Sequence, residues 1–367
     1  MQVTAAVVRQ PGAEFLIETV ELDDPRADEI RVRIHAVGVC HTDLAFTQPG
    51  VPLALPAVLG HEGAGVVEAI GADVTKVAVG DRVALTFRSC GTCDRCQSGD
   101  PAYCRTMPVL NYIGMRPDGT TTIKAGEERV SSNFFGQSSF ASHCIAYERN
   151  VLKLPDYIPF PLAAPLGCGV QTGVGGVINA LAARKGSSII ITGGGAVGLS
   201  AVMGAKIQGC AHIVVVEPMA NRRELAKELG ATAAIDPTDA STNLADALRA
   251  ALPNGADYAF DTTGRSDVLN AVMTVLAPKG VLGVVGIPAP GTPLPGDLNT
   301  VLTFGQTVRG IIEGDADPDV FIPELIAHWK AGRLPLEKLV RTWRFAEINA
   351  AIAAQHHGEA VKVVLTF

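Results

Sequence analysis

The densest group of metal-ligating side chains in the sequence is a run of four cysteines, Cys90, Cys93, Cys96 and Cys104. Four thiolates at such spacings bind Zn²⁺ as a closed tetrahedron, with Zn–S distances of about 2.3 Å, and leave no coordination position open. Residue type alone also allows an iron–sulfur cluster, whereas a disulfide cluster is disfavoured in a reducing compartment. We therefore predict a structural zinc in a lobe at residues 90–104, which orders the chain and does no chemistry.

A second set of candidate ligands is dispersed along the chain and consists of Cys40, His61, Glu62 and Cys168. Two thiolates, one imidazole and an open fourth position make a catalytic zinc site, in which the open position takes water or substrate. The spacing does not show that these side chains meet, and a lone buried cysteine is usually inert. By residue type alone, the set is either a catalytic zinc site or a group of ordinary core residues.

A glycine pattern, Gly193-x-Gly195-x-x-Gly198, follows an apolar run at 187–192 and precedes a predicted helix at 196–209. In that context the glycines permit a tight turn and a close approach of the backbone to a pyrophosphate, which the N–H groups at the helix N-terminus face. The spacing alone is weak evidence in a chain with 39 glycines. The strand and helix around it favour a dinucleotide cofactor.

An acidic residue, Glu217, lies 19 residues after the last glycine of this pattern, at the end of a predicted strand at 212–217. A carboxylate at that place accepts hydrogen bonds from an adenosine ribose and repels a 2′-phosphate, which favours NAD over NADP. Arg222 and Arg223 follow closely and weaken that preference. The alternative is that Glu217 is an exposed acid at a strand end.

Composition narrows the class of protein. The chain has 367 residues, a length that allows two or three domains. Of these residues 47% are hydrophobic and 18% charged, which allows a large buried core. A net charge of −7 without basic runs argues against nucleic-acid binding. No run approaches the ~18 apolar residues of a membrane span, and residues 1–20 lack the features of a secretory signal. We expect a cytoplasmic protein with reduced cysteines.

The pattern of predicted elements changes near residue 170. Before it, short Val- and Ile-rich runs alternate with polar residues between Pro and Gly, which predicts a β-rich domain. After it, apolar strands alternate with helices, as in a doubly wound parallel sheet. A helix at 318–331 and a strand at 359–367 break that alternation, so we expect the tail to return to the first domain. The polar stretch 115–133 is expected to be an exposed loop or hairpin. The elements of the second pattern are predicted at 187–192, 196–209, 212–217, 221–231, 256–264, 266–277 and 280–287.

With these motifs in this order, the chain resembles the zinc-dependent alcohol dehydrogenases of the medium-chain dehydrogenase/reductase superfamily. The likeness extends from end to end, through GVCHTD (38–43), GHEGAGVVEAIG (60–71), GCGVQTG (167–173) and GGGAVG (193–198) to the final VLTF. It implies an α/β protein with a GroES-like β-rich catalytic domain, residues 1–167 and 314–367, and a Rossmann NAD-binding domain, residues 168–313. It also implies an active-site cleft between the domains and a homodimer or homotetramer.

By this resemblance the dispersed set is a catalytic zinc site, which brings the expected zinc ions to two per chain. Cys40, His61 and Cys168 are implied as its ligands. Glu62 resembles an acid that approaches the metal during ligand exchange, and Asp43 resembles the carboxylate that orients His61. The implied reaction is reversible oxidation of an alcohol to its aldehyde, with hydride transfer to NAD.

The resemblance also assigns substrate and cofactor contacts. Thr42 matches a hydroxyl residue that hydrogen-bonds the alcohol and moves its proton, and His41 matches a basic residue that faces the cofactor pyrophosphate. Ala45 replaces the histidine that completes the proton relay in many relatives, so the proton must leave by another route. Further cofactor contacts are expected at Thr172, Arg222 and Lys362. A solvated lysine at a strand end is an equal alternative for the last of these.

Within the superfamily, GCGVQTG and the segment beginning IIEGDADP (311–318) are most similar to bacterial aryl-alcohol (benzyl alcohol) dehydrogenases. Phe87, Leu110 and Phe134 match positions that line the family's substrate channel, where they would form an apolar slot, or they are ordinary core residues. Aliphatic, terpene or glutathione-dependent formaldehyde substrates are alternatives within the class. An alternative of another class is a non-catalytic zinc-ribbon module joined to a nucleotide-sensing domain.

Overall fold

The computed structural model describes residues 1–241 and 243–367, which form two compact units. Unit 1 consists of Met1–Cys168, Asp317–Ala327 and Leu336–Phe367, and unit 2 consists of Gly169–Ala316 and His328–Pro335. Within the described residues, no helix combines the length and the apolarity that crossing a bilayer requires.

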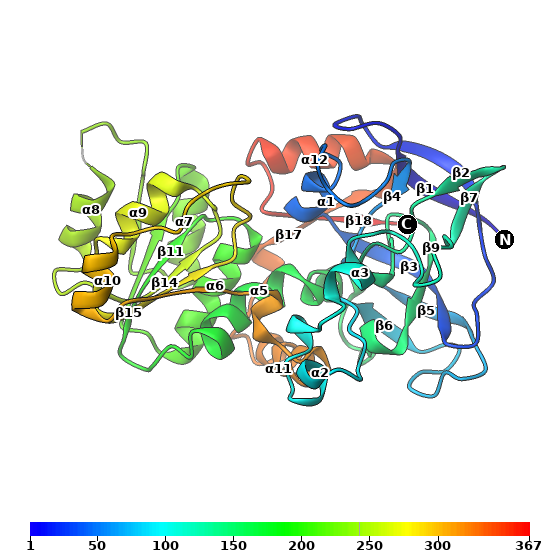
Figure 1. The fold of residues 1–367 in the computed structure, drawn as a ribbon, viewed down its shortest axis with the longest axis horizontal. Helices are drawn as coiled ribbons and strands as arrows, with labels where there is room; N and C mark the ends of the chain where they lie inside the picture. The colour runs from blue at the N-terminus through cyan, green and yellow to red at the C-terminus, as the bar shows by residue number, and fades with distance from the viewer. Residues whose placement is uncertain (242) are drawn as a thin grey trace. The chain divides into compact units, whose positions relative to one another are not determined.

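Unit 1 is β-rich and contains two sheets (Figure 1). The smaller sheet has the strand order β4-β1-β2-β7-β8, and all its pairings are antiparallel. Its strands are β1 (Gln2–Val8), β2 (Leu16–Leu22), β4 (Ala57–Val58), β7 (Ile123–Ala125) and β8 (Glu128–Val130). The short helices of this unit are α1 (His41–Ala45), α2 (Asp94–Gln97), α3 (Met107–Asn111) and α4 (Phe160–Ala163), and a longer one is α12 (Ile348–His356).

The larger sheet of unit 1 has the order β10-β6-β5-β3-β18-β17, with β9 paired to β3 as well. Its strands are β3 (Glu29–Gly38), β5 (Gly63–Ile70), β6 (Arg82–Leu85), β9 (His143–Tyr147), β10 (Val151–Lys153), β17 (Val340–Arg344) and β18 (Lys362–Thr366). In β3 the apolar residues Ile30, Val32 and Ile34 point into the core between polar neighbours, which is the alternation that the sequence predicts.

The end of the chain joins this sheet. Strand β18 pairs antiparallel with β3 and places Val364 opposite Gly38 (Figure 1). The tail therefore returns to the β-rich unit, as the break in the strand–helix alternation predicts. Since Gly38 lies just before Cys40, this pairing brings the last strand beside the first candidate zinc ligand.

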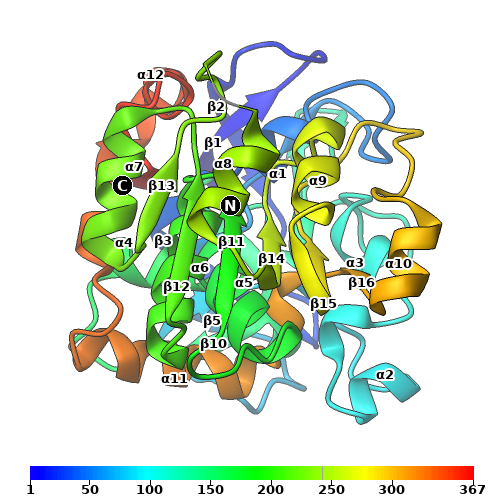
Figure 2. The ribbon, with the colours of Figure 1, turned by 90° about the vertical axis from the view of Figure 1, so that its left-hand side faces the viewer.

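Unit 2 is built on a six-stranded sheet in the order β13-β12-β11-β14-β15-β16, and every pairing in it is parallel (Figure 2). Its strands are β11 (Ser188–Thr192), β12 (His212–Val216), β13 (Ala233–Ile235), β14 (Ala256–Asp261), β15 (Leu276–Val284) and β16 (Thr307–Gly310). Its helices are α5 (Gly169–Gly175), α6 (Ala196–Gln208), α7 (Ala220–Leu229), α8 (Leu244–Ala251), α9 (Ser266–Met273) and α10 (Leu298–Phe304), and α11 (Pro318–Lys330) has residues in both units. The predicted fold class, α/β with a β-rich domain and a doubly wound parallel sheet, is confirmed.

The polar stretch at 115–133 is only partly what the sequence predicts. It does contain the hairpin of β7 and β8, but it is not simply exposed. Arg116 is 3% exposed, because its guanidinium binds both oxygens of the buried Glu29 at 2.6 and 2.9 Å. The Tyr147 hydroxyl donates to the same carboxylate at 3.1 Å. This network anchors the first residue of β3, the strand that leads to Cys40.

The pair of Glu29 and Arg116 gives a prediction for stability. Burial raises the pKa of Glu29, but Arg116 and the backbone N–H of Arg26 outweigh burial and lower it below its ordinary value of 4.5. Replacing Arg116→Met leaves a buried carboxylate unpaired and should lower the free energy of unfolding by about 3–5 kcal/mol. Because the pKa of Glu29 is lower in the folded protein, its stabilisation is present above pH 4.5 and is lost as pH falls through the folded-state value.

Urea unfolding of the wild type and of Arg116→Met, at neutral and at acidic pH, measures this effect. The difference between the two proteins should shrink in acid. Arg9→Met is the matched control, since its ion pair with Glu18 is 35% and 22% exposed, and it should cost less than about 1 kcal/mol. Equal losses in the two variants would contradict the assignment of the stabilisation to the buried pair.

Candidate active site and metal centres

The dispersed candidate ligands of the sequence lie together in unit 1. Cys40 follows β3, His61 and Glu62 lead into the neighbouring strand β5, and Cys168 is the last residue of the first segment of unit 1. One ligand atom from each of these four residues lies within 4.8 Å of all the others. The antiparallel pairing of β3 with β5, which sets Val37 opposite Gly63, brings the first two ligands side by side.

The His61 imidazole is held in one orientation by Asp43. Its Nδ1 lies 2.8 Å from Asp43 Oδ1, which also accepts the Gly60 N–H at 3.0 Å. The other oxygen, Oδ2, accepts the Cys40 N–H at 2.9 Å. His61 Nε2 is buried and has no hydrogen-bond partner among the described residues. A buried polar atom without a partner calls for an explanation such as a metal ion, and beside two sulfurs this nitrogen fits zinc.

Electrostatics favour the metal-binding form of Cys40. Contact with the Cys168 side chain lowers the pKa of the Cys40 thiol well below its ordinary value. Burial opposes that change, and the nearby imidazole of His61 adds to it. The thiolate is the form of cysteine that binds metals, so the site presents the donor that zinc requires.

The structure excludes one of the two interpretations of Lys362, that of a solvated lysine at a strand end. Lys362 is 3% exposed, and its Nζ lies 2.5 Å from Glu62 Oε2 and donates to the Val39 carbonyl at 2.9 Å. Gly38 makes room for this pair, because a Cβ there would lie 2.0 Å from the same carboxylate oxygen. Glu62 therefore has a buried cationic partner, and the predicted contact of Lys362 with the cofactor stays a prediction.

Two further predicted site residues lie on the first turn of α1. Thr42 is half-buried, and its Oγ1 lies 3.8 Å from Cys40 Sγ. His41 is exposed. The hydroxyl of Thr42 is thus next to the ligand set, where a proton donor or acceptor for a bound alcohol is needed.

The three predicted pocket residues lie in different surroundings. Phe87 and Phe134 are buried in the main core of unit 1, and Phe134 meets His61 edge-on at 5.7 Å between ring centroids. Leu110 packs instead with Cys104 and Met107 beneath the four-cysteine lobe. Its role in a substrate pocket stays a prediction.

Sequence reasoning missed side chains around His61. Phe135 stacks on the imidazole with 4.4 Å between centroids, and Gln137 donates to the His61 carbonyl through Nε2 at 2.9 Å. The doublet of aromatic residues in NFFG (133–136) was the one available signal. It does not say which of the two rings faces His61.

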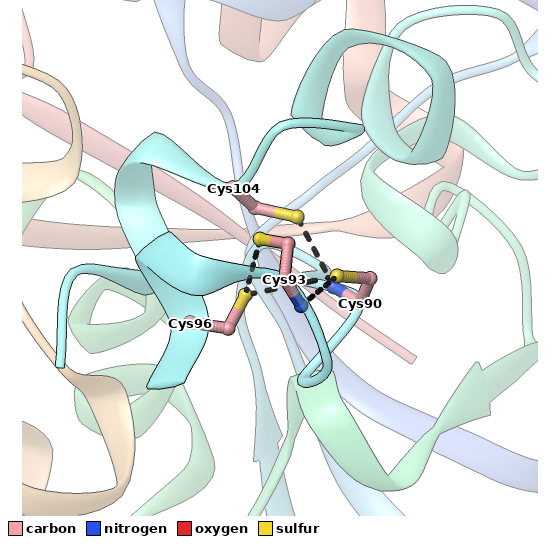
Figure 3. Close-up of side chains that lie close together, drawn as sticks. All are labelled: Cys90, Cys93, Cys96 and Cys104. Atoms are coloured by element: carbon pink, nitrogen blue, oxygen red, sulfur yellow. Dashed lines mark hydrogen bonds between the residues drawn. The ribbon is translucent and has the colours of Figure 1, made fainter. Parts of the chain in front are cut away.

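The four-cysteine lobe gathers its sulfurs around one point, as Figure 3 shows. Cys96 Sγ lies 3.6 Å from that of Cys93 and 3.9 Å from that of Cys90. Burial raises the pKa of Cys90, but hydrogen bonds, chiefly from the backbone and hydroxyl of Thr92, outweigh it and lower the pKa to about 5. In the described residues all eight cysteines are free thiols, so the lobe is not a disulfide cluster.

In unit 2 the glycine pattern forms the turn between β11 and α6. Gly193 has φ +92°, a conformation that favours glycine. A Cβ at Gly198 would lie 1.8 Å from the Gly193 carbonyl oxygen, so only glycine lets the helix pack on the turn. A Cβ at Gly195 would meet nothing within 4 Å, which leaves the backbone at the N-cap of α6 accessible to a ligand.

Glu217 is buried at 4% exposure, so the alternative of an exposed strand-end acid is wrong. Its carboxylate accepts the Gly194 N–H at 2.6 Å and the Met219 N–H at 2.9 Å, which ties the end of β12 to the glycine turn. Arg223 binds Asp236 at 2.9 Å and the Pro218 carbonyl at 2.6 Å.

Two more predicted cofactor residues lie elsewhere in unit 2. Arg222 is half-buried on α7, near Glu217 in sequence. Thr172, on α5, donates its hydroxyl to the buried Glu313 at 3.4 Å. The cofactor roles of both residues stay predictions.

Comparisons with known proteins agree with this architecture. Residues 26–156 match the alcohol dehydrogenase GroES-like domain, and residues 196–328 match the zinc-binding dehydrogenase family. The chain is 47% identical over 364 residues to the geraniol dehydrogenase of Castellaniella defragrans, covering 99% of this chain and 97% of that protein.

Solved structures are similar over the whole chain. An alcohol dehydrogenase zinc-binding domain protein from Burkholderia ambifaria is 46% identical, with a TM-score of 0.96 and coverage of 100% of this chain and 99% of that one. Benzyl alcohol dehydrogenase from Acinetobacter calcoaceticus is 38% identical, with a TM-score of 0.95 and the same coverage.

The chain belongs to the zinc-dependent alcohol dehydrogenases, with a GroES-like domain and a zinc-binding dehydrogenase domain. It is an enzyme, so the alternative of a non-catalytic nucleotide-sensing module is wrong. Family membership and the two ligand sets confirm the predicted cofactors, zinc and NAD.

The two ligand sets predict the metal content of single variants. The wild type should hold one zinc for each set, two per chain. Cys168→Ala should lose the zinc of the dispersed set and all alcohol oxidation, because a ligand is removed without a substitute. Cys210→Ala, which lies outside both sets, should keep both ions. Mass spectrometric metal analysis per chain decides this, and a Cys168→Ala protein with undiminished zinc would contradict the assignment.

Proposed function

We propose that this enzyme oxidises primary alcohols whose carbinol carbon is bonded to an aromatic ring or a C=C bond, with NAD as the hydride acceptor. The observation that carries the proposal is the convergence of Cys40, His61, Glu62 and Cys168, whose ligand atoms lie within 4.8 Å of one another. Cys40, His61 and Cys168 supply the ligands of a catalytic zinc site. The carboxylate of Glu62, which is paired with Lys362, lies next to these ligands.

When bound, zinc supplies the Lewis acidity that makes an alcohol hydroxyl more acidic, and NAD accepts the hydride. The side chains of the chain supply orientation and proton transfer. Asp43 holds His61 with Nε2 toward the sulfurs, and the thiolates of Cys40 and Cys168 complete the ligand set. Thr42, beside Cys40 Sγ, accepts the hydroxyl proton of the substrate and passes it on. Since Ala45 cannot take part, the proton leaves from Thr42 by a route that does not use that position.

Two observations support an activated, apolar alcohol. Apolar rings lie beside the candidate metal ligands, because Phe134 and Phe135 pack against His61. Two of the similar proteins are a geraniol dehydrogenase and a benzyl alcohol dehydrogenase. Both named alcohols carry an sp² carbon next to the carbinol carbon, so the developing carbonyl is conjugated in each product. The observations support a terpene alcohol as well as a benzylic one.

A panel of alcohols tests the substrate class. We expect kcat/KM for benzyl alcohol, cinnamyl alcohol and geraniol to exceed that for ethanol by about 10- to 200-fold, the range that apolar pocket contacts supply. Hexanol is the matched control, because it has apolar bulk but no conjugation. Comparable efficiency with ethanol and benzyl alcohol, measured as NADH formation, would refute the proposal. Geraniol far above benzyl alcohol would assign the enzyme to terpene alcohols.

Thr42 gives a separate test of the proton step. Thr42→Val keeps the shape of the side chain but removes the hydroxyl, and it should lower kcat by about 10²- to 10⁴-fold. The zinc content should not change, because Thr42 is not a ligand. Thr42→Ser, which keeps a hydroxyl, should retain most of the activity. Near-normal turnover of Thr42→Val would remove this residue from the proton path.

We propose NAD rather than NADP as the physiological cofactor. The Glu217 carboxylate is fixed by two backbone N–H groups next to the glycine turn, and its charge disfavours a 2′-phosphate there. Arg223, six residues further along the chain, has its charge balanced by Asp236.

The proposed location is the cytoplasm, where reduced thiols persist.

We also propose that the enzyme is a homo-oligomer that associates through unit 2. Leu294, Leu298 and Leu302 are 85%, 81% and 79% exposed, and β16 is the last strand at its edge of the sheet. Segment 285–308 carries one charged side chain, Asp297. An apolar, nearly uncharged surface beside an open sheet edge suits a second copy of itself across a two-fold axis.

Light scattering after size exclusion tests the association. Leu298→Glu should shift the particle toward the mass of a single chain, 38.2 kDa, because it places a charge in the proposed interface. Leu16→Glu, at another exposed leucine (49%), is the control and should not change the mass. An unchanged mass for Leu298→Glu would place the interface elsewhere.

A further inference from the structure

Four aromatic rings form a closed circuit beside His61. Phe46 lies 4.9 Å from Phe134 and 5.2 Å from Tyr112. Phe135 completes the circuit, at 4.8 Å from Phe134 and 5.6 Å from Tyr112. Offset and edge-on ring pairs at such distances attract one another beyond the burial of their area. The four rings therefore support each other as one rigid cluster.

The backbone of Phe135 has an unfavourable conformation in this cluster. Its φ is +53°, in the left-handed region that a bulky side chain rarely adopts, and it is 3% exposed. The surroundings hold this conformation: Asn150 Nδ2 donates to the carbonyls of Phe135 and Gly136 at 3.1 and 3.0 Å. Strain of this kind persists where the surrounding structure fixes it, and it concentrates at functional sites.

The strained residue presents its ring to the candidate zinc ligand. The rings of Phe135 and His61 lie 4.4 Å apart with an interplanar angle of 25°, a stacked arrangement. Phe134 meets the same imidazole edge-on at 5.7 Å and 85°. Asp43 fixes the imidazole through Nδ1, but one hydrogen bond leaves the ring free to tilt about it. Stacking restricts that tilt.

We infer that Phe135 is a positioning residue for the catalytic metal: its ring holds the plane of His61 so that Nε2 stays aimed at the sulfurs of Cys40 and Cys168. The inference rests on the proposed role of these residues as zinc ligands. Asp43 and Phe135 then constrain different motions of the same imidazole, one in the ring plane and one out of it. Removing Phe135 should weaken metal retention at this set and leave the four-cysteine lobe unchanged.

Release of zinc from the holoenzyme to a chromophoric chelator measures metal retention. The four-cysteine lobe serves as the internal reference, because it is a second metal set of the same chain. Phe135→Leu should speed release of one zinc by about 10-fold, the lower end of the effect of outer-shell partners on metal affinity. Phe135→Tyr keeps an aromatic ring and should release zinc at the wild-type rate.

Two further variants separate positioning from packing. Phe15→Leu removes a buried ring of the same core, which packs edge-on against Phe140, and it should leave both release rates unchanged. Phe135→Asn also removes the ring, but asparagine tolerates a positive φ. This variant replaces Phe135→Leu in the experiment if Phe135→Leu does not fold, and it should show the same faster zinc release. Equal zinc release from ring-less variants and wild type would overturn the inference, as would an equal effect of Phe15→Leu.

The outcome is independent of the substrate proposal. Altered zinc release with no oxidation of any alcohol in the panel would uphold the positioning role and refute the proposed substrates. Oxidation of benzyl alcohol or geraniol with unchanged zinc release in Phe135→Leu would refute only the positioning role.

Discussion

The Asp43 carboxylate is the interaction on which the site depends. Its two oxygens accept the N–H groups of Gly60 and Cys40 and bind the His61 imidazole. One buried group thus joins the segment after β3 to the segment before β5. Because Asp43 is fully buried, its carboxylate depends on these partners to offset the cost of removing it from water.

The fold places this group by long-range pairing. Strands β3 and β5 set the two ligand segments side by side, and the last strand, β18, brings Lys362 to Glu62 from the far end of the chain. The acidic neighbour of the metal set therefore has a counter-charge within the core, which lowers the cost of burying it. The return of the tail to unit 1 therefore supplies the cation that pairs with Glu62 beside the candidate zinc ligands.

The sequence predicts what is local and fails where geometry is long-range. The four-cysteine lobe and the glycine turn could be recognised because their residues are close in sequence. The convergence of Cys40, His61 and Cys168 came from a resemblance, since strand pairing and not spacing produces it. Glu217 and Lys362 allowed exposed alternatives, because burial depends on partners such as Gly194 and Glu62. Helix α10 was not predicted, although Leu298, Val301 and Leu302 have helical spacing, because it is only seven residues long and buries none of its side chains. The positive φ of Phe135 has no signature in an aromatic doublet.

The central claim is that three side chains hold a zinc ion and leave one coordination position to the substrate. Anomalous diffraction at the zinc edge from crystals of the holoenzyme tests it most directly. The account predicts a peak bonded to Cys40 Sγ, His61 Nε2 and Cys168 Sγ, with Zn–S distances of about 2.3 Å and a non-protein atom at the fourth vertex. A peak found only in the four-cysteine lobe, or a fourth protein ligand in every crystal, would contradict it.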